Sequence, residues 1–416
     1  MEKNNQWFKD NLLGRFLRYT AIDTMSDPDQ TKKPTTQGQW ELADLLIAEL
    51  KNLGITDIYR DVNGFVIASV PPRHCTHQKV IGLMAHLDTS PEVSGKNVAA
   101  RVHADYDGSI LELGNGYVLD PGQFPDLGAY KGDTIITTDG STLLGADDKA
   151  GVTEIMSALE YLSLHEDIGH PGLEVIFTTD EETGRGMNQF PVSRLKSVFC
   201  YTVDGGDEGF IESENFEAYK VLVKLAGKSF HLGKAKGKMI NSIQLATQML
   251  SLFPAVEKPE TTDAREGYYC PIEIKGTIES SQIQILIRDF SETECIRRIG
   301  NIERLAGVME TLYPGAKIAV TSEKQYANMG RFLKQDDPGL QLLEKAIRMT
   351  GREPVYTSIR GGTDGSRLSE MGIPTPNIFT GGHNFHSRFE WIPLSAMVRA
   401  AHTIVNLVEL WAAETV

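Results

Sequence analysis

Apolar residues follow two periods along the chain, and segments of the two kinds alternate. Four runs are almost continuously apolar and predict buried β-strands, at 65–70, 80–85, 173–178 and 199–203. Residues 40–53 and 152–162 carry apolar side chains every three or four positions, which predicts amphipathic helices. Strands that alternate with helices are typical of an α/β fold in which helices cover a mainly parallel sheet.

The pattern changes beyond residue 215. Residues 219–225 and 283–288 alternate between apolar and polar, as half-buried strands do, and residues 242–252 and 292–312 have helical spacing. From residue 340 the pattern of buried strands and helices resumes. We therefore expect a three-layer α/β domain built from residues 1–216 and 329–416, with a smaller α+β domain inserted at 217–328.

Composition narrows the class of protein. A chain of 416 residues, 41% of them hydrophobic, is long enough to divide into two cores. Its net charge of −15 argues against nucleic acid as a partner, because binding phosphates requires clustered Lys and Arg. Four widely spaced cysteines, Cys75, Cys200, Cys270 and Cys295, indicate neither a disulfide framework nor a thiolate zinc site.

The sequence also lacks the features of a membrane or exported protein. No apolar stretch is long enough to span a bilayer. The first 20 residues are charged and have helical spacing, without the apolar core or cleavage site of a signal peptide. We expect a cytoplasmic protein with no membrane partner.

The most informative motif is Ala-His-Leu-Asp-Thr-Ser-Pro at 85–91, which follows the second apolar run. His86 and Asp88 lie two positions apart, so on a strand both side chains point to the same face. A histidine that binds a metal usually has its second ring nitrogen held by a carboxylate or carbonyl, and Asp88 is a candidate for that role.

Acidic residues also gather next to the other predicted elements. Asp147 and Asp148 precede the predicted helix at 152–162, where a helix N-cap is the alternative interpretation. Glu181 and Glu182 follow the apolar run at 173–178, where a solvated acidic loop is the alternative. Asp204 ends the run at 199–203.

One further segment, 379–390, contains two histidines, His383 and His386, which spacing alone does not separate. The carboxyl ends of parallel strands meet at one edge of a sheet, where ligands bind in open α/β folds. Histidines and carboxylates together form the nitrogen and oxygen donor set that zinc accepts. The sequence therefore predicts a metal site at this edge.

These motifs, together with Phe216 and the run Ile-Arg-Gly-Gly-Thr-Asp-Gly at 359–365, resemble the peptidase T family of tripeptide aminopeptidases. That family belongs to a wider clan of two-zinc peptidases that includes the aminoacylases, and the resemblance covers essentially the whole chain. It implies a catalytic domain with an inserted lid domain, small peptides as substrates, and a monomer or a homodimer through the lid. It also implies two Zn²⁺ ions per subunit, which Co²⁺ or Mn²⁺ can replace.

The resemblance assigns a role to each motif. It implies five metal ligands, His86, Asp147, Glu182, Asp204 and His386. Asp147 would bridge both zinc ions, with His86 and Asp204 on one zinc, and Glu182 and His386 on the other. Asp88 would orient the His86 ring, and Glu181 would be the general base for a zinc-bridging water. The family's ligand begins a His-small-x-x-Glu pattern, which favours His386 over His383.

Four residues would bind the substrate. The segment 229–237 resembles the family's lid motif, although Leu232 and Lys234 replace the more usual Pro and Thr, and it implies that His231 stabilises the oxyanion. Asn241, Arg288 and Arg360 resemble the residues that bind the C-terminal carboxylate of the peptide, which would restrict substrate length. An ion pair between Arg288 and the adjacent Asp289 is the structural alternative.

Three other functions are alternatives to a tripeptide aminopeptidase. An acylamino-acid deacylase or a dipeptidase would keep the same five metal ligands. A non-catalytic metal-binding or peptide-binding protein would have no need of a base, so Glu181 and Asp88 count against it. A phosphate cradle at 361–365 lacks the following Gly-Lys-Ser/Thr of a P-loop.

Overall fold

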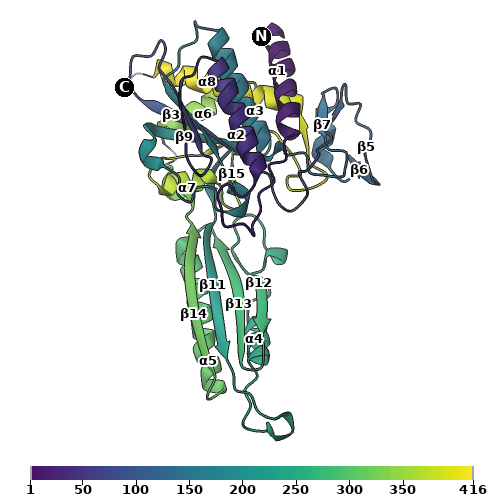
Figure 1. Ribbon diagram of the computed structural model, residues 1–416, viewed down its shortest axis with the longest axis vertical. Coiled ribbons are helices and arrows are strands. Elements are labelled where there is room, and N and C mark those ends of the chain that lie inside the picture. The colour runs from purple at the N-terminus through teal and green to yellow at the C-terminus, as the bar shows by residue number, and fades with distance from the viewer. Residues whose placement is uncertain (1, 335, 415–416) are drawn as a thin grey trace. The chain divides into compact units, whose positions relative to one another are not determined.

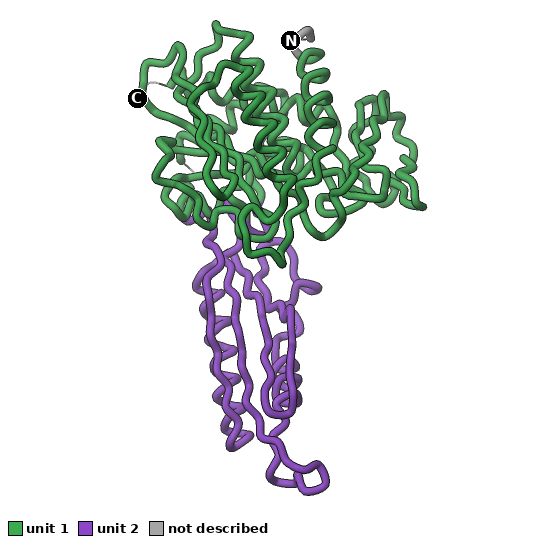
Figure 2. The backbone as a smooth tube through the Cα atoms, viewed as in Figure 1, with its two compact units in different colours: residues 1–213, 332–357, 363–416 green, residues 214–331, 358–362 purple. Residues whose placement is uncertain are grey.

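The computed structural model describes residues 2–334 and 336–414, and the chain divides into two units (Figure 2). Unit 1 comprises residues 1–213, 332–357 and 363–416, and unit 2 comprises residues 214–331 and 358–362. The predicted insertion, 217–328, falls within unit 2, which also takes in a few residues on either side and the short segment 358–362.

Unit 1 is built around an eight-stranded sheet (Figure 1). The strands, in spatial order, are β1 (Asp57–Arg60), β2 (Val66–Val70), β8 (Gly172–Thr178), β3 (Val80–His86), β9 (Ser197–Gly205), β16 (Asn377–Phe379), β10 (Phe210–Asn215) and β15 (Val355–Ile359). The central strands β8, β3, β9 and β16 are parallel, whereas β1 pairs antiparallel with β2, β2 with β8, and β10 with β16. The α/β class is confirmed, with a sheet that is mixed and parallel at its centre.

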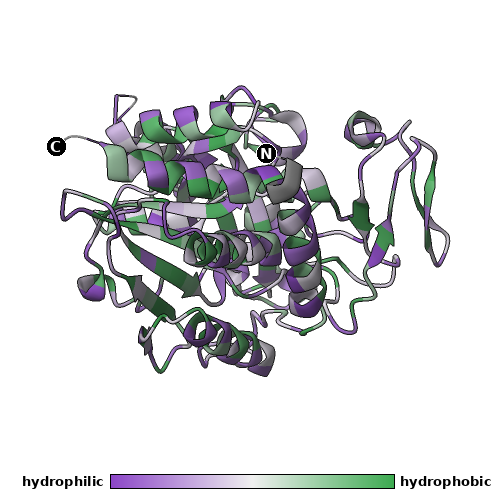
Figure 3. Cartoon of the chain, turned by 90° about the horizontal axis from the view of Figure 1, so that it is seen from above, coloured by the Kyte–Doolittle hydropathy of each residue, from purple (hydrophilic) through white to green (hydrophobic). Residues whose placement is uncertain are grey.

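Helices cover the faces of this sheet. They are α1 (Glu2–Thr20), α2 (Gln37–Asn52), α3 (Ala146–Leu164), α6 (Pro338–Met349), α7 (Asp364–Glu370) and α8 (Leu394–Ala413). Helix α3 packs on β3 and β9 and is also covered by α1 and α8, so most of its residues are buried. Helix α7 packs on β9, and its Leu368 joins a core with Phe65, Met84 and Ile176. The strands of the sheet are mainly hydrophobic, whereas the helices carry hydrophobic and hydrophilic faces (Figure 3).

Unit 1 also contains two small sheets that the sequence patterns do not predict. One consists of β17 (Trp391–Pro393), β7 (Ile135–Thr137) and β4 (Arg101–His103), and the other of β5 (Leu111–Gly114) and β6 (Tyr117–Leu119). Side chains from both sheets share a separate hydrophobic cluster that includes Leu119, Ile135 and Trp391. Strands of three or four residues are too short for alternation to be recognised.

Unit 2 is an antiparallel sheet with two helices, as the predicted α+β class requires. The strands, in spatial order, are β12 (Tyr268–Gly276), β13 (Ser280–Asp289), β11 (Glu217–Ala226) and β14 (Lys317–Tyr326). Helices α4 (Ser242–Ser251) and α5 (Glu292–Leu312) contribute to the same core as the sheet. The outer strands β12 and β14 are missed from the sequence because they are largely exposed and alternate only weakly.

The order of the central strands places the candidate residues. Since β3, β8 and β9 are parallel, their carboxyl ends meet at one edge of the sheet. His86 ends β3, Asp204 lies near the end of β9, and the turn with Glu181 and Glu182 follows β8. No helix within the described residues is long and apolar enough to cross a membrane.

Candidate metal centre

Asp147 lies between the two histidines of the predicted metal site. Its Oδ1 is 2.9 Å from Nε2 of His86, and its Oδ2 is 3.1 Å from Nε2 of His386. One carboxylate therefore faces two separate imidazoles, one with each oxygen. Asp147 reaches this position from the first turn of α3, and its peptide bond to Asp148 is cis.

Each histidine also faces a second carboxylate. Nε2 of His86 lies 3.5 Å from Oδ1 of Asp204, and Nε2 of His386 lies 3.0 Å from Oε1 of Glu182. The five residues predicted as ligands thus form two half-sites that share Asp147. His386 comes from the loop between β16 and β17 and has a positive φ of 58°.

The ring of His86 is fixed on its other side by Asp88. Nδ1 of His86 donates to the backbone carbonyl of Asp88 at 3.0 Å and lies 3.4 Å from the Asp88 carboxylate. This hydrogen bond leaves Nε2 as the nitrogen that faces Asp147 and Asp204, which is the orientation a metal ligand needs.

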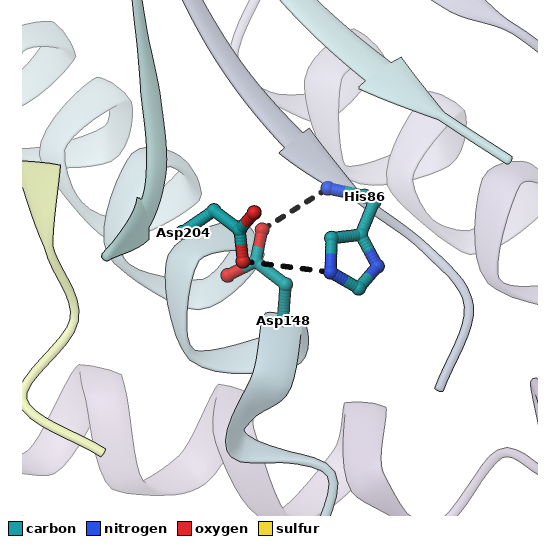
Figure 4. Close-up of side chains that lie close together, drawn as sticks. All are labelled: His86, Asp148 and Asp204. Atoms are coloured by element: carbon teal, nitrogen blue, oxygen red, sulfur yellow. Dashed lines mark hydrogen bonds and ion pairs between the residues drawn. The ribbon is translucent and has the colours of Figure 1, made fainter. Parts of the chain in front are cut away.

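Asp148 is close to the same histidine but is held differently (Figure 4). Its Oδ2 accepts the backbone N–H of His86 at 3.0 Å, and its Oδ1 accepts the backbone N–H of Gly151 at 3.2 Å. The side chain therefore connects the end of β3 to the first turn of α3. Gly151 is required there, because a Cβ would lie 1.8 Å from the carbonyl oxygen of Val203.

The electrostatics of the cluster favour a cation. Burial and the nearby Asp147 raise the pKa of Glu182 to about 8. Burial also raises the pKa of Asp204, to about 6. Burial opposes the charged form of His386, yet Asp147 and Glu182 raise its pKa to about 11. Buried carboxylates this close repel one another unless positive charge lies among them.

Asp88 also holds the turn that carries the predicted base. Its two carboxylate oxygens accept the backbone N–H groups of Glu181 at 3.0 Å and Glu182 at 3.1 Å. These residues form a short 3-10 helix, η2 (Glu181–Thr183), that begins after Asp180 in the left-handed conformation. Burial raises the pKa of Glu181 well above its usual range, and the neighbouring carboxylates of Asp364 and Asp204 add to this.

Glu390 holds the backbone that carries Asp147, a role that the sequence does not reveal. Its Oε2 accepts the backbone N–H groups of Leu144 at 2.7 Å and Gly145 at 2.8 Å, and its Oε1 accepts that of Asp147 at 3.1 Å. The side chain is almost fully buried. The His-small-x-x-Glu pattern ends at this glutamate and so singles it out in the sequence. The pattern does not show which groups the glutamate binds.

His383 has different neighbours from His386. Its ring stacks on Trp391, with centroids 4.1 Å apart, and its Nδ1 lies 3.2 Å from Oδ1 of Asp207. Its Nε2 is buried and has no hydrogen-bond partner among residues 2–334 and 336–414. In the described structure His383 faces none of the five candidate ligands.

The four predicted substrate-binding residues all belong to unit 2, including Arg360, which was expected in the larger domain. His231 is exposed, and Asn241 caps α4 by accepting the N–H of Ile243 at 3.0 Å. Arg288 donates to the carbonyl oxygens of Tyr219 and Ile287 and to Gln325.

The predicted alternative for Arg288, an ion pair with Asp289, is not observed, because Asp289 pairs with Arg298 at 2.6 Å. Arg360 donates to the carbonyl oxygens of Thr262, Ala264 and Glu266. In the part of the chain that the structure describes, neither Arg288 nor Arg360 forms an ion pair.

The residues present fit a pair of zinc ions. The donors are imidazole nitrogens and carboxylate oxygens, the set that zinc accepts. Oε1 of Glu182 is buried and accepts no hydrogen bond within the described residues, although it lies 3.0 Å from Nε2 of His386. A carboxylate with one oxygen toward each histidine suits a ligand that two metal ions share.

Known proteins place the chain in a family. The sequence profile of peptidase family M20/M25/M40 matches residues 143–410. Peptidase T of Geobacillus thermodenitrificans is 44% identical over 409 residues, which cover 98% of this chain and all of the relative. These matches confirm the prediction of a metal-dependent aminopeptidase.

Solved structures agree with the fold. Aminopeptidase PepT from Bacillus cereus has a TM-score of 0.75 at 21% identity, over 98% of this chain and 99% of that one. A Bacillus subtilis protein described as a dinuclear metal binding peptidase from the M20 family has a TM-score of 0.67 at 15% identity, over 98% and 99% of the two chains. The chain therefore belongs to the peptidase T family of tripeptide aminopeptidases, within peptidase family M20/M25/M40.

Proposed function

We propose that the chain releases the N-terminal residue from tripeptides with the help of two zinc ions held by His86, Asp147, Glu182, Asp204 and His386. The observation that carries the proposal is the position of Asp147, whose two carboxylate oxygens face His86 and His386 separately. Asp204 would complete one half-site and Glu182 the other. The donor set also accepts Co²⁺ or Mn²⁺.

When bound, two zinc ions lower the pKa of a shared water from about 16 towards neutrality and polarise the carbonyl group under attack. The chain would supply the proton transfer. Glu181 is the base in this proposal, since its backbone is fixed by Asp88 and it faces none of the candidate histidines at ion-pair distance among the described residues. It would accept a proton from the attacking water and pass it to the leaving amine.

The proposed carboxylate-binding residues are Asn241, Arg288 and Arg360, with His231 as donor to the oxyanion. Arg288 is only 9% exposed and has no ion-pair partner among the described residues. A buried guanidinium without a counter-ion is costly unless a ligand provides negative charge, and its planar fork suits a carboxylate. Recognition of the C-terminal carboxylate would restrict the length of the substrate.

The proposal also includes the cellular location and the oligomeric state of the enzyme. We propose a cytoplasmic enzyme that acts on small peptides as a monomer or as a homodimer through unit 2. Ile272 and Ile274, which are 52% and 49% exposed on the outer strand β12, support a contact of unit 2 with a second copy.

The test is an assay of zinc-loaded protein with matched di-, tri- and tetrapeptides, in which the released amino acid is identified. We expect the tripeptide to be cleaved fastest, with its first residue released. An N-acetylated amino acid in the same panel separates this function from that of an acylamino-acid deacylase. Equal rates on all three peptide lengths, or preferred cleavage of the acetylated substrate, would contradict the proposal.

A further inference from the structure

The ammonium group of Lys33 lies against the segment that follows Glu181 and Glu182. Nζ donates to the carbonyl oxygens of Arg185 at 2.7 Å, Gly186, and Asn188 at 3.2 Å. The same group lies 4.4 Å from the centroid of the Phe65 ring. A single lysine therefore binds three carbonyl oxygens within four residues of chain.

Residues near Lys33 hold the other end of this segment. The backbone N–H of Thr35 donates to Oδ1 of Asp180 at 3.0 Å, and Nε2 of Gln39 donates to the same atom at 2.8 Å. The backbone N–H of Asp180 in turn donates to Oε1 of Gln39 at 3.1 Å. Asp180 directly precedes Glu181, so residues 33–39 fix the chain on both sides of the predicted base and ligand.

Three carboxylates lie near the lysine, although none forms an ion pair with it among the described residues. Burial lowers the pKa of Lys33, and the nearby charges of Asp364, Asp180 and Asp88 oppose that decrease. Asp364 is almost fully buried and packs directly on the turn, since a Cβ on Gly186 would lie 2.2 Å from its Oδ1. Asp88 accepts the N–H groups of Glu181 and Glu182.

Each of these three carboxylates thus belongs to, or touches, the segment 180–188. Buried carboxylates require a positive partner close by. Lys33 is a cation near all three, and within the described residues it makes no hydrogen bond or ion pair to the imidazoles of the candidate ligands.

We propose that Lys33 is a positioning residue for the reaction, whose ammonium group fixes the turn that carries Glu181 and Glu182 through its hydrogen bonds to the carbonyl oxygens of residues 185–188. The inference rests on the proposed function for the roles of Glu181 and Glu182. Lys33 itself touches neither substrate nor metal in this account. Its effect on the rate passes through the backbone of residues 185–188.

The test compares Lys33→Met, which keeps the length of the side chain but removes its charge and donors, with Lys33→Arg, which keeps both. Lys32→Met is the matched control, because Lys32 is the adjacent lysine and is exposed. Three quantities are measured on purified folded protein, namely kcat and KM on a tripeptide, the zinc affinity by competition with a chelator, and the melting temperature.

We expect Lys33→Met to lower kcat about tenfold or more with KM within about twofold, because a displaced base affects the chemical step more than substrate binding. We also expect zinc affinity to fall at least several-fold, since Glu182 lies in the same turn. Lys33→Arg should restore most of kcat and of zinc affinity, and Lys32→Met should match the wild type.

If Lys33 only stabilises the fold, Lys33→Met will lower the melting temperature but leave kcat and the zinc affinity of the folded protein unchanged. That outcome would overturn the inference. If Lys33→Met does not fold, Lys33→Gln replaces it, and unchanged kcat and zinc affinity in that neutral variant would overturn the inference equally. Absence of tripeptide turnover in the wild type counts against the proposed function alone, because the zinc affinities still test Lys33.

Discussion

Oε1 of Glu390 accepts the backbone N–H of Asp147 at 3.1 Å, so a residue far along the chain fixes the carboxylate that lies between the two histidines. Oε2 of the same side chain accepts two more N–H groups, from Leu144 and Gly145. A side chain with three backbone donors determines where the first turn of α3 begins, and thereby where Asp147 lies.

Replacing this acceptor should weaken metal binding. In Glu390→Gln the amide nitrogen cannot accept a hydrogen bond, so at least one buried N–H loses its partner. We expect zinc affinity to fall about 10- to 100-fold, as for other residues that position metal ligands. Competition with a chromogenic chelator measures the change. Glu409→Gln, an exposed glutamate on α8, is the control, and equal affinities in both variants would contradict the role given to Glu390.

Substitutions of Glu181 and Glu182 should have different effects on turnover and on zinc content, although the two residues are adjacent. We expect Glu181→Gln to lower kcat by about 10²- to 10⁴-fold while both zinc ions are retained, because only the proton transfer is lost. Glu182→Gln should lower the zinc content, since its carboxylate faces His386. Turnover combined with metal analysis separates the two effects. Retention of kcat in Glu181→Gln would show that another group is the base.

Removal of metal should destabilise unit 1. Asp147, Glu182 and Asp204 would then repel one another without a cation among them. We expect the melting temperature to fall on treatment with a chelator and to recover on addition of zinc. A ligand that binds only the folded state at 100 times its dissociation constant contributes about 2.7 kcal/mol. An identical thermal transition with and without metal would count against a bound cation.

Glu154 should make stability depend on pH. Its side chain is fully buried in α3, and neither carboxylate oxygen has a hydrogen-bond partner among the described residues, so burial raises its pKa well above the usual range. The folded state then binds a proton that the unfolded state releases above its ordinary pKa, so this group's contribution to stability decreases as pH rises, by up to about 1.4 kcal/mol per pH unit.

Glu154→Leu should therefore be more stable than the wild type at about pH 8, with a smaller difference at about pH 5. Urea unfolding at several pH values measures this difference. Glu166→Leu, at an exposed glutamate, is the control and should not alter the pH dependence. A difference between wild type and Glu154→Leu that stays constant with pH would show that Glu154 is not protonated in the folded state.

The sequence predicts the centre of the molecule better than its periphery. Strands β3 and β8 are buried on both faces, so they are continuous apolar runs that any period analysis finds. Strands β12 and β14 are missed because an outer strand with exposed faces has no strong pattern. The small sheet that includes Trp391 is missed because its strands have three residues each.

The candidate site, like the fold, could be predicted from the sequence only in part. His86 and Asp204 could be placed together because parallel strands end at a common edge. The choice between His383 and His386 required a family resemblance, since spacing carries no information about which ring turns toward Asp147. The hydrogen bonds of Glu390 and Lys33 to distant backbone groups leave no periodic signal, so they become visible only in three dimensions.

In the proposed metal centre, five side chains hold two cations around Asp147. The most direct test is a crystal of the zinc-loaded protein, with anomalous scattering recorded on both sides of the zinc absorption edge. We expect two peaks about 3.5 Å apart on either side of the Asp147 carboxylate, one beside His86 and Asp204 and the other beside Glu182 and His386. A single peak, or peaks at other side chains, would contradict it.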